Sequence, residues 1–372
     1  MFALLFISIF TLIIIIIIEG SLSSLFASIF VYSIGFFFSL NVERNKRSYS
    51  IKLFFIVSTI YLISAYIFSL SFQSGSYFLI SDPLTYLEEF SLDRDNSIEF
   101  YLQYFYDGYF KLSDNNVLHN AYVRLSALFA NTFLDGGSVL YATLLNTLFG
   151  ILSTTVLYRI LLIYFSPKKA YKYALYFSLL SLFHFYSVVI VRDIIIAFFY
   201  LLVIEIVLKK YSTKNLIKLL VLLLIVWGIR LYSGLFIIVF ILYYVYVPLR
   251  NSKFKPIILP LYILLLIFLV FTSSIVVEQS LEEIKLYQDF SIEKGEVSGG
   301  LSNYILNLPF GIKQVALTIY SQFHPFPPYA PLLSATTFSQ YYMSVLTFIY
   351  SVWWAFVFFP LLLFSIMIKS TP

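Results

Sequence analysis

The sequence predicts an all-α integral membrane protein with about ten transmembrane helices. Of its 372 residues, 60% are hydrophobic and only 12% are charged. The mean hydropathy is +0.90. This composition excludes a soluble globular protein. Many of the apolar runs approach the roughly 20 residues that a helix needs to cross a bilayer.

Ten apolar runs account for the expected helices, and two long polar stretches, 73–135 and 276–342, interrupt them. The first run has no cleavage-site pattern and a second run follows at once, which favours a retained helix over a removable signal peptide. Residues 119–134 are only moderately apolar, so we expect a helix that lies along the membrane surface. Residues 1–372 are interpreted as a single polytopic membrane domain. The runs are 2–18, 21–40, 53–72, 138–164, 173–190, 194–208, 217–233, 234–248, 257–275 and 343–368.

The basic residues set the expected orientation of the chain. With ten spans and both termini in the cytoplasm, 16 of the 24 Lys and Arg residues fall on the cytoplasmic side, and 17 of the 19 Asp and Glu residues fall outside. One continuous helix over 173–208 would be about 54 Å long and would put Lys209 and Lys210 on the outer side. Two spans are therefore expected there. Both polar stretches become outer loops of a protein in the bacterial cytoplasmic membrane, an assignment that the wealth of Ile, Phe, Tyr, Lys and Asn also favours.

Composition also limits the chemistry. The chain has no cysteine and three histidines, so disulfides, thiolate catalysis and a Cys- or His-based metal centre are not expected. The net charge of +5 is explained by the basic cytoplasmic connections, and we expect membrane lipids rather than nucleic acid as partners. The Gly-rich segment 295–303 does not match a phosphate-binding loop.

Arginines at neighbouring outer turns are the first candidate site. Arg192 precedes Asp193 between two apolar runs, and Arg230 lies in GIRLYSG between the next two. A guanidinium group at a lipid–water boundary can hold a phosphate through two parallel hydrogen bonds. The alternative is that each arginine is an ordinary helix-end residue that reaches for water or pairs with an acid. Arg124, on the expected surface helix, is a third candidate, with a solvated or headgroup-facing charge as its alternative.

Two outer residues could carry acid–base chemistry. Asp82, in SDPLTYLEEF, could act as a general base or ligate a divalent cation, the one cofactor considered. The Ser81-Asp82-Pro83 sequence is equally a good helix start. His324, in QFHPFPPYAP, could exchange protons, or the prolines could make this stretch a rigid cap.

His184 lies inside an apolar run, about two helical turns below Arg192, where a hydrogen-bonded core histidine is the simpler interpretation. Aromatic residues are dense in YLQYFYDGYF (101–110), beyond what a membrane-interface belt needs. A glycan-binding surface is one explanation for them.

Over roughly residues 53–250 the chain resembles the GT-C-type membrane glycosyltransferases and the Wzy-type oligosaccharide repeat-unit polymerases of bacteria. The likeness consists of Asp82 and Tyr86 after an early span, the long first outer loop, the turn FYSVVIVRDIIIAFF and the later RLYSG. This resemblance implies a polyprenyl-phosphate- or pyrophosphate-linked sugar donor and a glycan acceptor on the outer face of the membrane. It makes Asp82 the base or metal-binding carboxylate, and Arg192 and Arg230 the residues that hold the lipid phosphate.

The expected function is therefore transfer of sugar, as a single residue or as a repeat unit, during assembly of a cell-envelope polysaccharide such as O-antigen or capsule. Other polysaccharide-assembly proteins are expected partners. A transporter or flippase of the same lipid-linked sugars is the alternative, and it predicts broken helices and charges at mid-membrane. A non-catalytic scaffold is the third class, and it predicts that no outer carboxylate matters.

Overall fold

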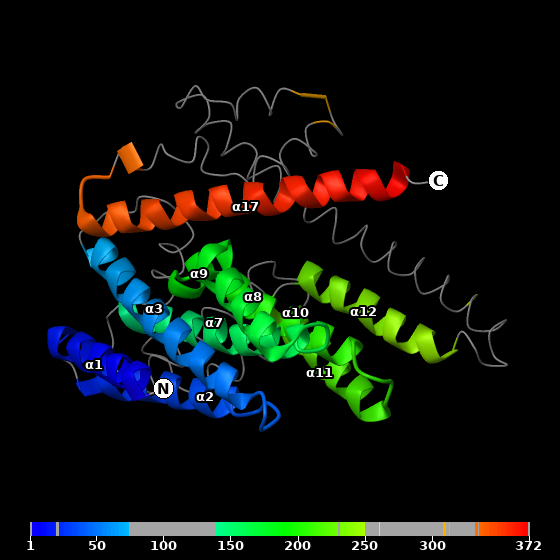
Figure 1. Cartoon of the computed structure of the whole chain (residues 1–372), viewed down its shortest axis with the longest axis horizontal. Coiled ribbons are helices and arrows are strands. Elements are labelled where there is room, and N and C mark those ends of the chain that lie inside the picture. Colours follow the sequence, from blue (N-terminus) through cyan, green and yellow to red (C-terminus); the bar gives the residue numbers. More distant parts are fainter. Residues whose placement is uncertain are drawn as a thin grey trace, which may run out of the picture. The chain divides into compact units, whose positions relative to one another are not determined.

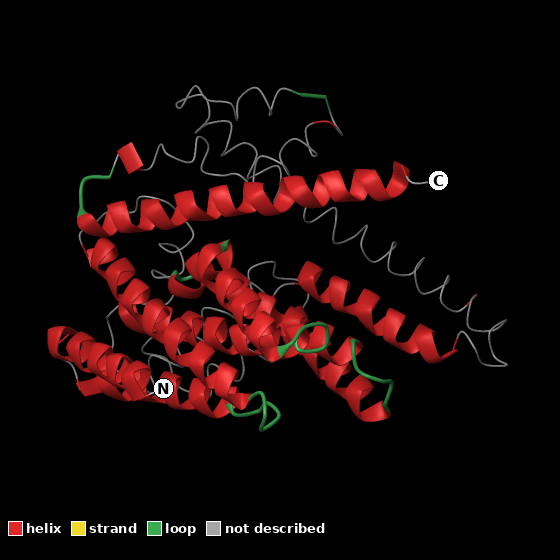
Figure 2. Ribbon diagram, in the orientation of Figure 1, coloured by secondary structure: helices red, strands yellow, loops and turns green. Residues whose placement is uncertain are grey.

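The computed structural model describes residues 2–19, 22–73, 139–229, 231–249 and 335–370, with a few isolated positions between 260 and 333 (Figure 1). The described residues form helices and short connections, and none of them lies in a strand (Figure 2). Two helical stretches within them, Arg47–Leu70 and Thr143–Leu161, are long and apolar enough to cross a membrane. The all-α class is thus confirmed for the described part of the chain, and the number of spans stays a prediction.

The chain divides into two compact units. Unit 1 comprises Met1–Ile241 and Pro331–Trp353, and unit 2 comprises Leu242–Ala330 and Trp354–Pro372. All of the contacts discussed below lie within unit 1, and the single membrane domain stays a prediction. The helices are α1 (Phe2–Glu19), α2 (Leu22–Ser39), α3 (Arg47–Gln73), α7 (Val139–Leu161), α8 (Pro167–Leu180), α9 (Leu182–Val188), α10 (Asp193–Val207), α11 (Thr213–Ile229), α12 (Leu231–Leu249) and α17 (Phe338–Ser370).

Most helix bounds lie close to the apolar runs, but one run is divided. The run 194–208 corresponds to α10, Asp193–Val207. The run 173–190 is not one helix, because α8 ends at Leu180 and α9 begins at Leu182. Between them Ser181 is extended, and its hydroxyl oxygen accepts a hydrogen bond from the backbone N–H of Phe183 at 3.2 Å. A serine that caps a new helix in this way explains the break.

Helix α7 lies at the centre of unit 1, where it contacts α2, α3, α8, α9 and α10. Its buried residues include small and polar side chains, among them Thr143, Asn146 and Thr154. At Gly150 a Cβ atom would lie 2.9 Å from the ring of Tyr61 and closer still to the side chain of Ser187 on α9. The absence of a side chain here lets α9 approach α7 closely, as small residues do between membrane helices.

The helix ends of unit 1 meet in two groups. In the first, Tyr158 near the end of α7 donates to the Lys46 carbonyl before α3 at 3.1 Å, and Arg159 binds Glu205 near the end of α10. We call this group the Arg159 end. In the second, residues of α3, α9 and the first part of α17 meet around His184. We call this group, with the adjoining start of α10, the His184 end.

Candidate functional site

The connection between α9 and α10 is a short non-helical link at the His184 end. The sequence Val188-Val189-Ile190-Val191 is entirely β-branched, a composition that favours extended backbone over helix. Val189 is accordingly extended, with φ −108° and ψ 160°. Val189, Ile190 and Val191 are all buried, with at most 3% of their surface exposed. Their backbone groups therefore need partners within the protein.

Helix α7 supplies those partners. The side-chain amide of Asn146 donates to the carbonyl of Val189 and, at 2.8 Å, to that of Val191. The next residue, Thr147, donates its hydroxyl to the Ser187 carbonyl at 3.2 Å. Two adjacent side chains of one helix thus stabilise the end of α9 and the link that follows it.

Arg192 and Asp193 stand where the link becomes α10. The Arg192 carbonyl accepts the first helical bonds, from the backbone N–H groups of Ile195 at 3.1 Å and Ile196 at 3.3 Å. Asp193 is the acidic residue of the first turn, a position that the helix dipole favours. Both side chains are half-buried. A helix start with an adjacent guanidinium group is chemically suited to hold an anion.

Near this turn, His184 is a hydrogen-bonded core histidine, as the simpler interpretation predicts. Its ring is 2% exposed and stacks on Tyr61, with ring centroids 4.9 Å apart. The Nε2 atom lies 2.9 Å from the hydroxyl of Ser64, and that hydroxyl lies 2.7 Å from the phenol of Tyr342 on α17. Ser64 also donates to the Ile60 carbonyl at 2.8 Å. This cluster joins three segments that are distant in sequence.

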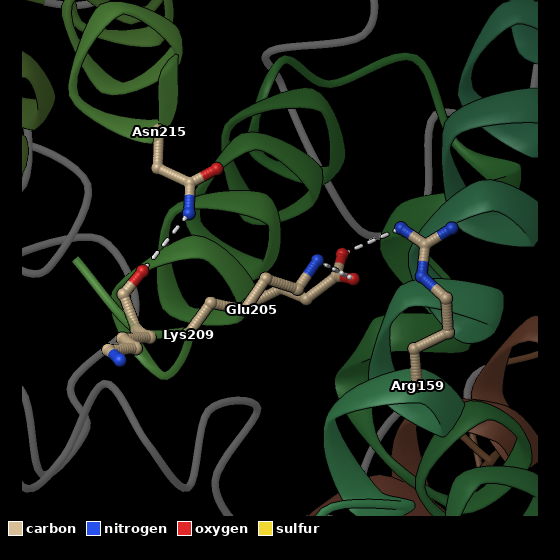
Figure 3. Close-up of polar contacts among 5 residues, drawn as sticks. Arg159, Glu205, Lys209 and Asn215 are labelled. Carbon is tan, nitrogen blue, oxygen red and sulfur yellow. Dashed lines mark hydrogen bonds and ion pairs between the residues drawn. The ribbon is translucent and has the colours of Figure 1, made fainter. Parts of the chain in front are cut away.

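The Arg159 end carries a compact group of ion pairs. The Glu205 carboxylate binds Arg159 at 2.7 Å and Lys209 at 2.8 Å. Figure 3 shows this carboxylate between the two cations. The Arg159 guanidinium also lies 4.8 Å from the ring centre of Phe38, a cation–π distance. One carboxylate thus holds a cation of α7 and a cation that follows α10, which is the arrangement of a structural contact.

The structure describes only part of the predicted site. It shows Arg192 and Asp193 together at the start of α10. Asp82, Arg124, Arg230 and His324 lie outside the described residues, so their relation to Arg192 stays a prediction. Within the described ranges, no group of three or more His, Cys, Asp or Glu residues could hold a metal ion. The divalent cation considered for Asp82 is not tested by that observation.

Sequence reasoning missed two polar residues at this end, Asn146 and Ser64. A signal for each exists, because each polar side chain interrupts an apolar run, 138–164 or 53–72. Their partners on other elements lie 43 to 278 residues away, and a local pattern does not identify such partners.

Unit 1 is thus a bundle of apolar helices with an ion-paired end and, at the other end, a basic turn on an interrupted helix. No family model matches the chain, and neither does any curated protein or solved structure. A function for the chain is therefore inferred from these residues and from the resemblance noted above.

Proposed function

We propose that the chain is an integral membrane glycosyltransferase or polymerase of cell-envelope polysaccharide, of the O-antigen or capsule type. It would take sugar from a polyprenyl-phosphate- or pyrophosphate-linked donor on the outer face of the bacterial cytoplasmic membrane. The observation that carries the proposal is the position of Arg192, at the first turn of α10 and beside a link that buried side chains hold out of the helix.

The charges of unit 1 support the orientation that this proposal needs. Lys46, Arg159 and Lys209 all belong to the Arg159 end. The expected topology leaves two acidic residues on the cytoplasmic side, Glu43 and Glu205, and both are ion-paired there. Positive charge gathers on the cytoplasmic side of membrane proteins. The Arg159 end would then be cytoplasmic, and Arg192 would face the outer surface.

The proposed chemistry assigns one role to each group. Arg192, with Arg230, would neutralise the lipid phosphate and stabilise the charge that develops on it as the bond to the sugar breaks. Asp82 would take the proton of the acceptor hydroxyl as that oxygen attacks the anomeric carbon. His324 is the second acid–base candidate. Arg124 and Asp193 would complete the phosphate-binding surface, and the aromatic loops would hold the glycan.

The test is complementation of a deletion strain of the native bacterium, with surface polysaccharide read on a gel. We expect Arg192→Ala to abolish the polymer while the protein reaches the membrane at its normal level. Arg192→Lys should recover little of it, because lysine lacks the planar fork of arginine. The matched control is Arg44→Ala, since Arg44 is exposed in the connection before α3. Normal polymer in both Arg192→Ala and Arg230→Ala strains would refute the proposal, and Asp82→Asn tests the base separately.

A flippase of lipid-linked oligosaccharide is the second candidate, because the helices break at Ser181 and again at 189–192. Interrupted helices are typical of carriers. The two functions separate by what accumulates in the deletion strain. Without a polymerase, single repeat units on lipid collect in the outer leaflet. Without a flippase, they stay in the cytoplasmic leaflet.

A further inference from the structure

Asn146 is a fully buried amide on a helix that is otherwise mostly apolar. Both groups that face its side-chain nitrogen, the carbonyls of Val189 and Val191, can only accept hydrogen bonds. The atom that faces them must therefore be the NH2 group, whose two hydrogens match two acceptors. The Val189 carbonyl also accepts the backbone N–H of Val191 at 3.1 Å. The link is thus bound to α7 at both of its ends.

These carbonyls lie in the non-helical link between the end of α9 at Val188 and the start of α10 at Asp193, so they stand outside the regular hydrogen bonding of both helices. Val189 is 0% exposed and Val191 is 3% exposed, so bulk water does not reach them. In apolar surroundings an unsatisfied backbone group is costly. Asn146 therefore makes it possible for the chain to leave the helix at this point.

We propose that Asn146 is a positioning residue for the Arg192 turn. The link that Asn146 holds leads directly into Arg192, and the Arg192 carbonyl already accepts the first bonds of α10. Any displacement of the link therefore moves the start of α10 and the Arg192 side chain together. By fixing Val189 and Val191, Asn146 sets the direction in which Arg192 and the first N–H groups of α10 face. The phosphate-binding role of Arg192 in this inference rests on the proposed function, whereas the positioning of Arg192 by Asn146 does not.

The geometric part is tested by cysteine labelling, since the chain contains no cysteine of its own. Arg192→Cys is introduced alone and together with Asn146→Leu, which keeps the approximate shape of asparagine and removes both donors. In nanodiscs, we expect the rate of reaction with a charged maleimide to rise about tenfold in the double variant, because two buried carbonyls lose the hydrogen bonds that Asn146 donates. Asn146→Gln should return the rate towards that of Arg192→Cys alone. Equal rates with and without Asn146→Leu would overturn the proposal.

The matched control is Asn215→Leu. Asn215 also donates its amide to a backbone carbonyl, that of Lys210 at 3.5 Å, but it is only half-buried and lies in the first turn of α11 (Figure 3). The Asn215→Leu replacement should leave the labelling rate of the Arg192→Cys variant unchanged. If Asn146→Leu does not accumulate in the membrane, Asn146→Ser keeps one donor and is expected to give an intermediate rate. An unchanged rate in that variant would also overturn the proposal.

The functional part is read with Arg192 intact, as binding of a fluorescent polyprenyl monophosphate to protein in nanodiscs. We expect Asn146→Leu to weaken binding about tenfold and Asn146→Gln to restore most of it, whereas loss of overall stability alone would not follow the amide in this way. If Asn146→Leu raises the labelling rate of Arg192→Cys, but Asn146→Leu and Arg192→Ala each bind the lipid normally, the proposed function is overturned and the geometric role of Asn146 stands. Weakened binding by Arg192→Ala but not by Asn146→Leu would overturn the positioning role.

Discussion

The two ends of unit 1 are held together by different chemistry. At the Arg159 end, charged side chains join the ends of regular helices, as Glu205 does with Arg159 and Lys209. At the His184 end, neutral side chains bind one another and the carbonyls of an interrupted backbone, as Asn146 does. The first arrangement joins helices directly through its ion pairs. The second maintains an irregular backbone in apolar surroundings, which persists only where the rest of the structure compensates for it and which tends to occur at functional sites.

A charged cluster is thus not by itself the better sign of function. Arg159 is the more conspicuous arginine, since its side chain is only 13% exposed and it has both an acidic partner and an aromatic one. Its contacts nevertheless account for its position. Arg192 stands instead at a helix start whose location depends on distant hydrogen bonds. The proposed function therefore involves the His184 end and not the Arg159 end.

The largest expected effect is a difference in labelling between the two ends, because they are expected on opposite sides of the membrane. Leu333 is 80% exposed shortly before α17, and Lys210 is exposed after α10. In right-side-out vesicles, an impermeant maleimide should label Leu333→Cys fully and Lys210→Cys only after permeabilisation, because the ends are expected on opposite faces. The natural chain, without cysteine, is the background control. Equal labelling of both variants in intact vesicles would show that the ends are wrongly assigned.

The second effect concerns the ion pairs. Glu205→Gln leaves the Arg159 charge without its acidic partner, and the two side chains are 10% and 13% exposed. We expect the free energy of unfolding, measured by SDS titration of the detergent-solubilised protein, to fall by about 3 kcal/mol. Replacing both residues, in Arg159→Leu with Glu205→Leu, should recover much of that loss, since no buried charge remains unpaired and the Lys209 side chain is 53% exposed.

The control for this prediction is Glu43→Gln. Glu43 pairs with Lys46 at 2.6 Å, but its side chain is 69% exposed. Loss of such a surface pair should cost less than about 0.5 kcal/mol. Similar effects of Glu43→Gln and Glu205→Gln would mean that the Arg159 group is solvated and does not hold the helices together.

The sequence is sufficient to predict most of the helices but not their continuity. Hydropathy places α7 within residues 138–164 and α10 within one residue of its bounds. It misses the break at Ser181, because apolar content measures the length of a buried segment and not its hydrogen bonding. The break depends on one capping hydroxyl, and the next interruption depends on an amide from another helix.

The candidate site is predictable only where its members are neighbours in sequence. Arg192 and Asp193 are adjacent, so the sequence alone brings them to one turn. Asn146 binds carbonyls 43 and 45 residues away, and Glu205 binds a guanidinium group 46 residues away. Such contacts depend on how the helices pack, which periodicity and charge do not determine.

The smallest effect is expected from the neutral cluster at the His184 end. The Ser64 hydroxyl joins α3 to α9 through His184 and to α17 through Tyr342, which is 278 residues away in sequence. Hydrogen bonds between membrane helices contribute about 0.6 kcal/mol on average. Ser64→Ala removes two such contacts, so the free energy of unfolding should fall by about 1 kcal/mol. Ser69→Ala is the control, because its hydroxyl donates to the Tyr66 carbonyl of its own helix.

A double-mutant cycle makes this last comparison sharper. If Ser64 and Tyr342 act through their shared hydrogen bond, Ser64→Ala and Tyr342→Phe should not be additive, and the pair should lose less than the sum of the two single losses. Additive losses would show that α17 is held to this end by packing alone. If Ser64→Ala lowered the free energy of unfolding more than Glu205→Gln does, the His184 end would contribute more to stability than the Arg159 end. The neutral cluster would then be the main structural support of unit 1, and a functional reason for its buried polar groups would no longer be needed.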